Sequence, residues 1–269
     1  MEIACIVIVV LLILYVLSLR GRAGHPGLKA LQGWHYAHRG LHGNGVPENS
    51  MEAFRLALEN GYGIELDIHL MKDDNLAVIH DSSLLRTAGA DVQIEDLTTE
   101  DICKYSLEGT QEKIPLFTEV LQLYRGQAPL IIELKTHQGN HVQLAAAAVK
   151  AMEGYDGPWC MESFDPRAVH ALRKNHPHVI RGQLTENFFK SPKNKLHPVL
   201  KWVMTTQILN FTTRPDFIAY RVSDRKRLGT FLCRKLWGLQ GVTWTVRNPQ
   251  DHADVVAEGW ISIFEGFRP

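Results

Sequence analysis

The chain has 269 residues, enough for one large domain or two small ones. A hydrophobic share of 45% and a charged share of 22% are typical of a globular protein with a full core. Lys plus Arg and Asp plus Glu number 29 each, so no overall field attracts nucleic acid, and we expect no nucleic-acid partner. Recognition of an anionic ligand therefore has to come from a local arrangement of charges.

The N-terminal run from Ile3 to Leu19 contains no charged residue. At about 1.5 Å per residue it spans about 26 Å, the short end of what a bilayer requires. We expect a single-pass transmembrane anchor over residues 1–20, followed by a linker over residues 21–33. A cleaved signal peptide is the alternative, although no basic residue precedes the run and no small-residue cleavage motif follows it cleanly.

Charge and cysteine usage bear on which side of the membrane the rest of the chain faces. Basic residues follow the run and none precedes it, which favours a cytoplasmic domain: Arg20, Arg22 and Lys29. Outside the run, three cysteines remain, without metal-ligand spacing, and they are typical of reduced or buried thiols: Cys103, Cys160 and Cys233.

From residue 34 onward, short apolar runs alternate with amphipathic stretches. Nine runs predict strands: Trp34–His38, Ile64–Ile68, Leu76–Ile79, Leu130–Leu134, Trp159–Glu162, His178–Gly182, Asp216–Tyr220, Gly241–Thr245 and Trp260–Phe264. Six stretches predict helices, the first of them with Ser50 as its N-cap: Ser50–Asn60, Phe117–Tyr124, Val142–Met152, Pro166–Lys174, Asp224–Trp237 and Pro249–Glu258.

The second and third predicted strands are separated only by His69 to Asn75, too few residues for a parallel crossover. They therefore predict an antiparallel hairpin that turns at Asp73-Asp74 and fills one position of a sheet. Eight positions in about 250 residues predict a (β/α)8 barrel of the TIM type over residues 34–269. The segment from Ser82 to Ile114 fits no repeat and is interpreted as an insertion after the hairpin.

Reacting groups in such barrels lie at the C-terminal ends of strands. Glu65 and Asp67 are two apart, so they point to one side of their strand. A two-residue hairpin loop sets His80 opposite Asp67, and a shift of one residue leaves it adjacent. Glu133, from a separate strand, completes an oxygen-rich site for one divalent cation, Mg²⁺ or Ca²⁺.

Basic and aromatic side chains accompany these carboxylates. Arg39 offers a planar fork and Lys135 a point charge for phosphate oxygens. His38 and His80 lie on different strands and can flank a phosphorus atom as acid and base. Trp244 is balanced between core packing and a platform for part of a bound ligand.

The order of these motifs resembles the glycerophosphodiester phosphodiesterase family. The matching stretches run in the family's order: His38-Arg39-Gly40, Pro47-Glu48-Asn49-Ser50, Glu65-Leu66-Asp67, His80-Asp81, Leu85-Arg86-Thr87, Ile132-Glu133-Leu134-Lys135, Glu162-Ser163-Phe164 and Val242-Thr243-Trp244-Thr245-Val246. They cover most of the chain after the linker.

The resemblance implies hydrolysis of glycerophosphodiesters to glycerol 3-phosphate and an alcohol. It assigns metal coordination to Glu65, Asp67 and Glu133, acid and base roles to His38 and His80, and phosphate contacts to Arg39 and Lys135. In the wider family's mechanism, a neighbouring substrate hydroxyl attacks phosphorus first, and water then opens the cyclic phosphate. The closing Thr-Asp motif of the family is missing from the run Ile261 to Gly266, which puts substrate contacts at that edge in doubt.

Two other functions stay open at this point. The apolar segment from Val199 to Phe211 is compatible with a groove for lipid chains, which fits a lysophospholipase D acting on membrane lysophospholipids. A catalytically inactive barrel that serves as a binding module is the third interpretation, and the intact set of polar residues argues against it. His35, His42 and His69 are interpreted as structural neighbours of the site, and Glu48 as structural or as a brace for it. The oligomeric state and the identity of the metal stay open.

Overall fold

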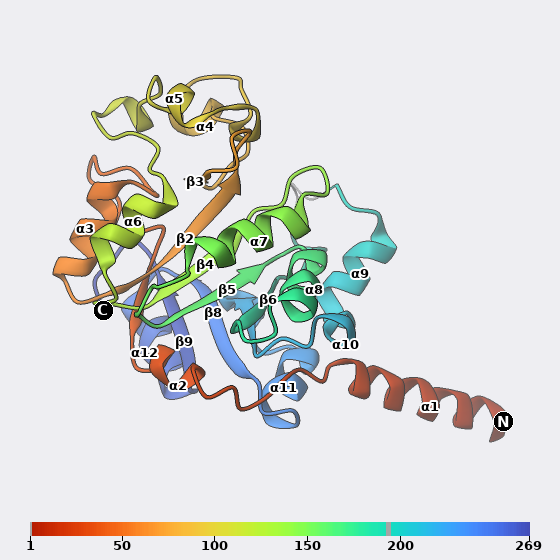
Figure 1. Ribbon diagram of the computed structural model, residues 1–269. Coiled ribbons are helices and arrows are strands. Elements are labelled where there is room, and N and C mark those ends of the chain that lie inside the picture. Colours follow the sequence, from red (N-terminus) through yellow and green to blue (C-terminus); the bar gives the residue numbers. More distant parts are fainter. Residues whose placement is uncertain (1, 192–194) are drawn as a thin grey trace.

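The structure is a computed structural model that describes residues 2–191 and 195–269. Met1 and residues 192–194, which fall within the predicted segments 1–20 and 34–269, lie outside the described residues. Eight parallel strands of the described chain form a closed barrel, because β1 pairs with both β2 and β9 (Figure 1). The strands are β1 (His35–His38), β2 (Gly63–Leu70), β4 (Leu130–Leu134), β5 (Trp159–Ser163), β6 (Arg181–Thr185), β7 (Phe217–Arg221), β8 (Gln240–Val246) and β9 (Trp260–Phe264). The predicted (β/α)8 barrel is confirmed.

Helices follow the strands and cover the outside of the barrel (Figure 1). They are α3 (Met51–Glu59), α6 (Phe117–Tyr124), α7 (His141–Ala151), α8 (Pro166–Asn175), α9 (Pro198–Thr206), α10 (Asn210–Thr213), α11 (Leu228–Lys235) and α12 (Pro249–Ala257), with a 3-10 turn, η3 (Val222–Asp224), before α11. The hydroxyl of Ser50 accepts a hydrogen bond from the Ala53 amide, so the predicted N-cap of α3 is confirmed. The prediction missed α9 and α10.

The fifth barrel strand, β6, begins three residues later than predicted. The predicted strand His178–Gly182 overlaps β6 only at Arg181 and Gly182. The residues before β6 form a turn that closes α8, with the Val179 amide donating to the His176 carbonyl. Pro177 lies inside this turn and cannot donate to a strand ladder.

The predicted hairpin is present, but its register is shifted by one residue. Strand β3 (Leu76–Val78) runs antiparallel to β2 and pairs Val78 with Ile68. Asp67 therefore lies opposite Ile79, whose amide donates to the Asp67 carbonyl at 3.1 Å. The loop is longer than the predicted pair Asp73-Asp74, because the Met71 amide already donates to the Asn75 carbonyl. His80 is the next residue and remains at the end of the hairpin.

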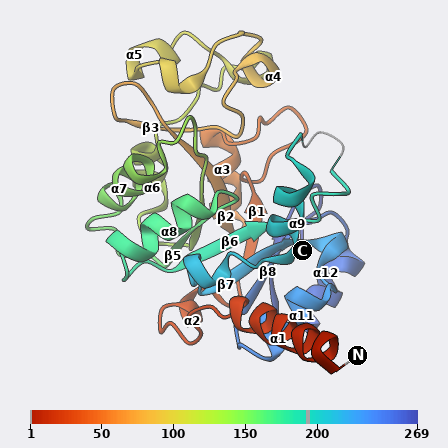
Figure 2. The same ribbon diagram turned by 90° about the vertical axis from the view of Figure 1, so that its right-hand side faces the viewer.

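The insertion after the hairpin folds as a small layer with its own core. It contains α4 (Leu85–Ala88), η1 (Ile94–Asp96), α5 (Thr99–Ile102) and η2 (Leu107–Gly109). Its buried apolar side chains pack on apolar side chains of the hairpin: Leu84, Ile94, Ile102, Leu107 and Ile114 on Met71, Ala77 and Ile79. Figures 1 and 2 show this layer on the opposite side of the molecule from the N-terminal helix.

The prediction of a transmembrane anchor, and with it a single-pass membrane protein with a cytoplasmic domain, was wrong. Helix α1 (Glu2–Ser18) has 17 residues and is about 26 Å long, shorter than a hydrocarbon core of about 30 Å. No helix within residues 2–191 and 195–269 has the length and apolar character needed to cross a membrane. The last turn of α1 and the residue that follows it contact the rest of the chain: the Trp237 indole donates to the Val16 carbonyl at 2.9 Å, and Leu19 is fully buried.

The predicted linker, residues 21–33, follows the outside of the barrel. Arg22 binds both carboxylate oxygens of Asp216, at 2.5 and 2.6 Å. The short helix α2 (Leu28–Leu31) buries its two leucines in the core cluster that also contains Phe217. This segment is therefore packed against the barrel along its length.

Close packing inside the barrel depends on a glycine in β6. Gly182 pairs with Phe217 of β7, and a Cβ atom at Gly182 would lie only 2.1 Å from the Phe217 ring. A methyl group therefore does not fit at this position unless the ring moves.

We expect Gly182→Ala to lower the free energy of unfolding by about 1–3 kcal/mol, because it overpacks a filled core. Urea unfolding followed by circular dichroism measures the change. Adding Phe217→Leu to the same chain removes the clashing ring edge and should recover part of the loss. An unchanged midpoint in Gly182→Ala would show that the barrel is looser here than the structure indicates.

Candidate active site

Three buried carboxylates meet at the C-terminal end of the barrel. Glu65 and Asp67 lie on β2, and Glu133 lies on β4 directly beside Asp67 in the register of the sheet. Their exposed fractions are 3%, 1% and 6%. One oxygen of each lies within 4.8 Å of the others. The predicted convergence of these three side chains is therefore present.

Two positively charged side chains lie among these carboxylates. Lys135 Nζ is 3.0 Å from Asp67 Oδ1 and 2.8 Å from Glu133 Oε1, and Arg39 Nε is 3.4 Å from Asp67 Oδ2. Burial and then the neighbouring carboxylates raise the pKa of Glu65 well above its usual range. Burial acts in the same direction on Asp67, but Lys135, His80 and Arg39 hold its pKa well below the usual range.

A fourth carboxylate, Glu162 of β5, lies beside Glu133 in the register of the sheet and is buried. Its Oε2 has no hydrogen-bond partner among the described residues. Burial, and then Glu133, raises the pKa of Glu162 well above its usual value. A buried oxygen without a partner, next to three more carboxylates, fits an oxygen-coordinated cation such as Mg²⁺ or Ca²⁺.

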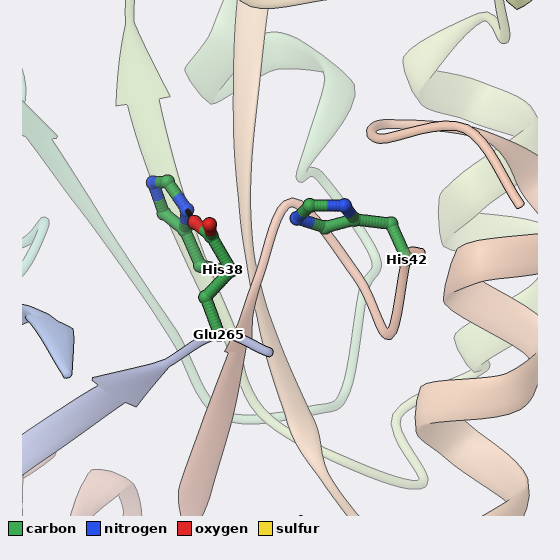
Figure 3. A group of neighbouring side chains, drawn as sticks. All are labelled: His38, His42 and Glu265. Atoms are coloured by element: carbon green, nitrogen blue, oxygen red, sulfur yellow. Dashed lines mark hydrogen bonds and ion pairs between the residues drawn. The ribbon is translucent and has the colours of Figure 1, made fainter. Parts of the chain in front are cut away.

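His38 ends β1 and lies between two carboxylates. Its Nδ1 is 2.6 Å from Oε2 of Glu265, which lies beside it in Figure 3. Its Nε2 is 3.9 Å from Glu65 Oε2. Because a carboxylate only accepts, the hydrogen bond to Glu265 keeps a proton on Nδ1 and leaves the lone pair on Nε2. Burial lowers the pKa of His38, so the neutral ring is favoured. Burial alone would raise the pKa of Glu265, but His38 and Arg247 lower it to about 2.

His80 lies at the other side of the same site. Its Nδ1 is 2.7 Å from Asp81 Oδ1, and Asp81 also binds Arg86. These two contacts hold the pKa of Asp81 below its usual value, with the His80 hydrogen bond as the larger cause. His38 and His80 line one cavity of about 40 Å³ together with Glu65, Glu133 and Glu162.

A hydrogen-bond chain from the insertion holds the backbone of His80. His69 Nε2 donates to the His80 carbonyl at 3.2 Å, and His69 Nδ1 lies 2.6 Å from Glu95 Oε1. Glu95 in turn accepts from the Ser82 hydroxyl at 2.5 Å. His69, interpreted from sequence as a structural neighbour, therefore connects the insertion to the site.

The loop after β1 supports the phosphate-binding candidates. Arg39 Nη1 binds Glu48 Oε1 at 2.9 Å, and Glu48 also binds Arg86 at 2.6 Å. The side-chain amide of Asn49 donates from Nδ2 to Asp67 Oδ2 at 2.9 Å. Glu48 therefore orients the guanidinium of Arg39, and Asn49 orients a carboxylate of the candidate metal site.

Trp244 of β8 lines the small cavity, and its ring packs edge-on against Phe164 with centroids 5.5 Å apart. A larger cleft of about 880 Å³ adjoins it, and His80, Glu133 and Lys135 are among its polar lining residues. Its walls carry apolar side chains: Phe164, Phe188, Leu196, Leu200 and Met204. Two of these come from α9, so the apolar segment singled out in the sequence contributes to this cleft.

Sequence reasoning missed three residues of the site. Glu265 lies where the family's closing motif was found missing, yet its carboxylate contacts His38. Asn49 and Glu162 were within matched motifs but received no role. Spacing signalled none of the three, because each meets the site through pairing between distant segments.

Comparison with known proteins agrees with this geometry. The sequence profile described as the Glycerophosphoryl diester phosphodiesterase family matches residues 38–264. A glycerophosphodiester phosphodiesterase of Caldanaerobacter subterraneus subsp. tengcongensis is 29% identical over 233 residues, 83% of this chain and 89% of that protein. A lysophospholipase D of Rattus norvegicus is 33% identical over 129 residues, 43% of this chain and 40% of that protein.

Among solved structures, a phosphodiesterase of Oleispira antarctica in complex with the product sn-glycerol-3-phosphate has a TM-score of 0.70 at 21% identity. The match covers 86% of this chain and 92% of that one. A glycerophosphoryl diester phosphodiesterase structure from Silicibacter pomeroyi has a TM-score of 0.72, also at 21% identity, with 90% and 94% covered. These likenesses show the shared fold. With its barrel, its ordered motifs and its matched profile, the chain belongs to the glycerophosphoryl diester phosphodiesterase family and is an enzyme that hydrolyses glycerophosphodiesters.

Proposed function

We propose that the enzyme cleaves glycerophosphodiesters to glycerol 3-phosphate and an alcohol, with His38 and His80 as the acid and base pair. The observation that carries this proposal is that both imidazoles line the same small cavity as the buried carboxylates. Arg39 and Lys135 are then the phosphate ligands, and Trp244 is the platform for the glycerol moiety.

Glu65, Asp67 and Glu133 would hold one divalent cation, Mg²⁺ or Ca²⁺. Their donor set consists of carboxylate oxygens, the ligands that these hard cations prefer. A bound cation of this kind stabilises negative charge that grows on phosphate oxygens. Asn49 and Lys135 support the site by contacting Asp67 and Glu133.

The two histidines have different surroundings, and this difference indicates which of them accepts a proton and which donates one. His38 is favoured in its neutral form with a free lone pair on Nε2, so it accepts the proton of the attacking hydroxyl. His80 lines both the small cavity and the large cleft, so it lies where the leaving alcohol departs and donates the proton to that oxygen. Where the attacking hydroxyl belongs to the substrate, water opens the resulting cyclic phosphate in a second step with the roles reversed.

His38→Ala and His80→Ala should each lower kcat on glycerophosphocholine by about 10²–10⁴-fold, the usual contribution of a general acid or base. Release of glycerol 3-phosphate, followed with a coupled dehydrogenase, measures the rate. His141→Ala, on the first turn of α7, serves as the matched control and should keep the wild-type rate. A rate near wild type in either active-site variant, with an unchanged circular dichroism spectrum, would remove the assigned role.

Treatment with EDTA should abolish turnover, and adding Mg²⁺ or Ca²⁺ should restore it, because buried carboxylates without a cation repel the substrate phosphate. Titration of each metal into the metal-free enzyme identifies the preferred ion. Glu133→Gln should raise the metal concentration needed for half of the maximal rate, while Glu153→Gln on the exposed surface should not. Full activity in EDTA would mean that turnover does not need a metal ion at this site.

A second candidate activity is lysophospholipase D hydrolysis, in which the substrate carries one acyl chain. The supporting observation is the cleft of about 880 Å³ that adjoins the small cavity and is lined by both polar groups and several apolar side chains. A chain of methylene groups laid along these walls gains about 0.8 kcal/mol for each group buried.

Leu200→Asp should lower kcat/KM for lysophosphatidylcholine by about tenfold, equivalent to losing about two buried methylene groups. The rate on glycerophosphocholine should remain within about twofold of wild type, because the catalytic groups are untouched. Trp202→Asp changes an exposed residue of the same helix that does not line the cleft, and it serves as the control. Equal loss on both substrates would mean that the cleft does not select acyl chains.

A further inference from the structure

A second group of metal-ligand side chains lies beside the carboxylate site, on the far side of His38. His38, His42 and Glu265 each offer one ligand atom within 4.8 Å of the others, as Figure 3 shows. They come from the end of β1, the loop that follows it, and the residue after β9. No residue of this group except His38 belongs to the candidate catalytic machinery as an acid or base.

The position of His42 is set by its loop. The His42 amide donates to the Gly40 carbonyl, and the Leu41 amide donates to the Ala53 carbonyl of α3. Gly40 adopts a φ of 80° and packs so closely on Ala53 that a Cβ atom would lie 2.8 Å away. The chain therefore leaves β1 along a fixed path that returns His42 to His38.

The free nitrogen of His42 indicates a ligand. His42 Nε2 is shielded from solvent and has no hydrogen-bond partner within the described part of the chain. A shielded polar nitrogen without a partner destabilises the folded state. In Figure 3 the His42 ring faces Glu265 and His38 across a short gap. A bound ion in that gap would satisfy the nitrogen.

The donor atoms select a different ion from that of the carboxylate site. Two imidazole nitrogens and one carboxylate oxygen suit Zn²⁺ and its transition-metal neighbours, whereas an all-carboxylate set suits Mg²⁺ or Ca²⁺. Zinc ligands lie about 2.0–2.2 Å from the ion, and the three ligand atoms, all within 4.8 Å of one another, lie close to that arrangement.

We propose that His38, His42 and Glu265 form an inhibitory site for zinc or a similar imidazole-preferring divalent ion. The inhibitory part rests on the proposed function, because it uses the role of His38 as a base. The ion binds His38 Nδ1 in place of the hydrogen bond to Glu265, and the single N–H proton of the neutral ring moves from Nδ1 by way of solvent to Nε2. His38 then has no lone pair on Nε2 to accept the proton of the attacking hydroxyl.

Neighbouring charges are compatible with a cation at this site. Glu265 Oε1 is held by Arg247 at 3.0 Å, which leaves Oε2, the oxygen that faces His38, for the ion. The positive charge of Arg39 is shared with Glu48 and Asp67. Binding at this site leaves Glu65, Asp67 and Glu133 free to hold their own cation.

To test the proposal, ZnCl₂ is titrated into the full-length enzyme at saturating Mg²⁺. The turnover rate is followed in one experiment and the heat of zinc binding in another. Wild-type enzyme should bind zinc calorimetrically and lose activity over the same concentration range. His42→Ala should keep the basal rate within about twofold and need at least about tenfold more zinc for either effect, as expected when a metal loses a ligand. His170→Ala, an exposed histidine of α8, should behave as wild type.

Three results would overturn the proposal. They are no zinc binding in the calorimeter, zinc binding that is unchanged in His42→Ala, or zinc inhibition that disappears as the Mg²⁺ concentration is raised. The last result places zinc at the carboxylate site. Failure of the proposed function is recognised separately, because His38→Ala would then retain its rate whatever zinc does. Zinc binding that depends on His42 without any loss of turnover would refute the inhibitory role.

Discussion

The whole site depends on keeping several buried carboxylates together at the end of the barrel. Like charges repel strongly where water is excluded, so Glu65, Asp67 and Glu133 remain close only because cationic groups compensate them. Lys135 lies between Asp67 and Glu133, and Arg39 approaches the other oxygen of Asp67. The same two cationic side chains are the phosphate ligands of the proposed reaction. The charge compensation that allows the carboxylates to be buried therefore also underlies the proposed function of the site.

Barrel closure brings distant parts of the chain to this point. Pairing of β1 with both β2 and β9 places His38 beside Glu65 on one side and near Glu265 on the other. Each imidazole has a carboxylate within hydrogen-bonding distance of Nδ1: Glu265 for His38 and Asp81 for His80. In the proposed reaction, Nε2 is the nitrogen that transfers the proton. The two histidines differ in their surroundings: one is enclosed, and the other opens toward the apolar cleft. That asymmetry supports different proton-transfer roles for two identical side chains.

Local patterns predicted much of the fold and the centre of the site. Spacing by two placed Glu65 and Asp67 on one side of a strand, and the short link to the next strand required a hairpin, so His80 was expected nearby. Patterns within a segment did not predict contacts between segments. The hairpin register depends on how the loop closes at Met71, the start of β6 depends on the turn at Pro177, and the roles of Glu265, Asn49 and His42 depend on pairing across the barrel. The apolar N-terminal run indicated a helix with nearly the observed bounds, but not what that helix contacts.

The insertion has a consequence for how this enzyme loses activity on heating. Its apolar side chains pack on the hairpin, and its Glu95 holds His69, which in turn holds the backbone of His80. Small peripheral layers open with less free energy than a closed barrel, which has no free edge. Thermal inactivation should therefore begin as a local event that releases His80 while the barrel stays folded, and cooling should reverse it. An organism can tune the working temperature of such an enzyme through the insertion alone.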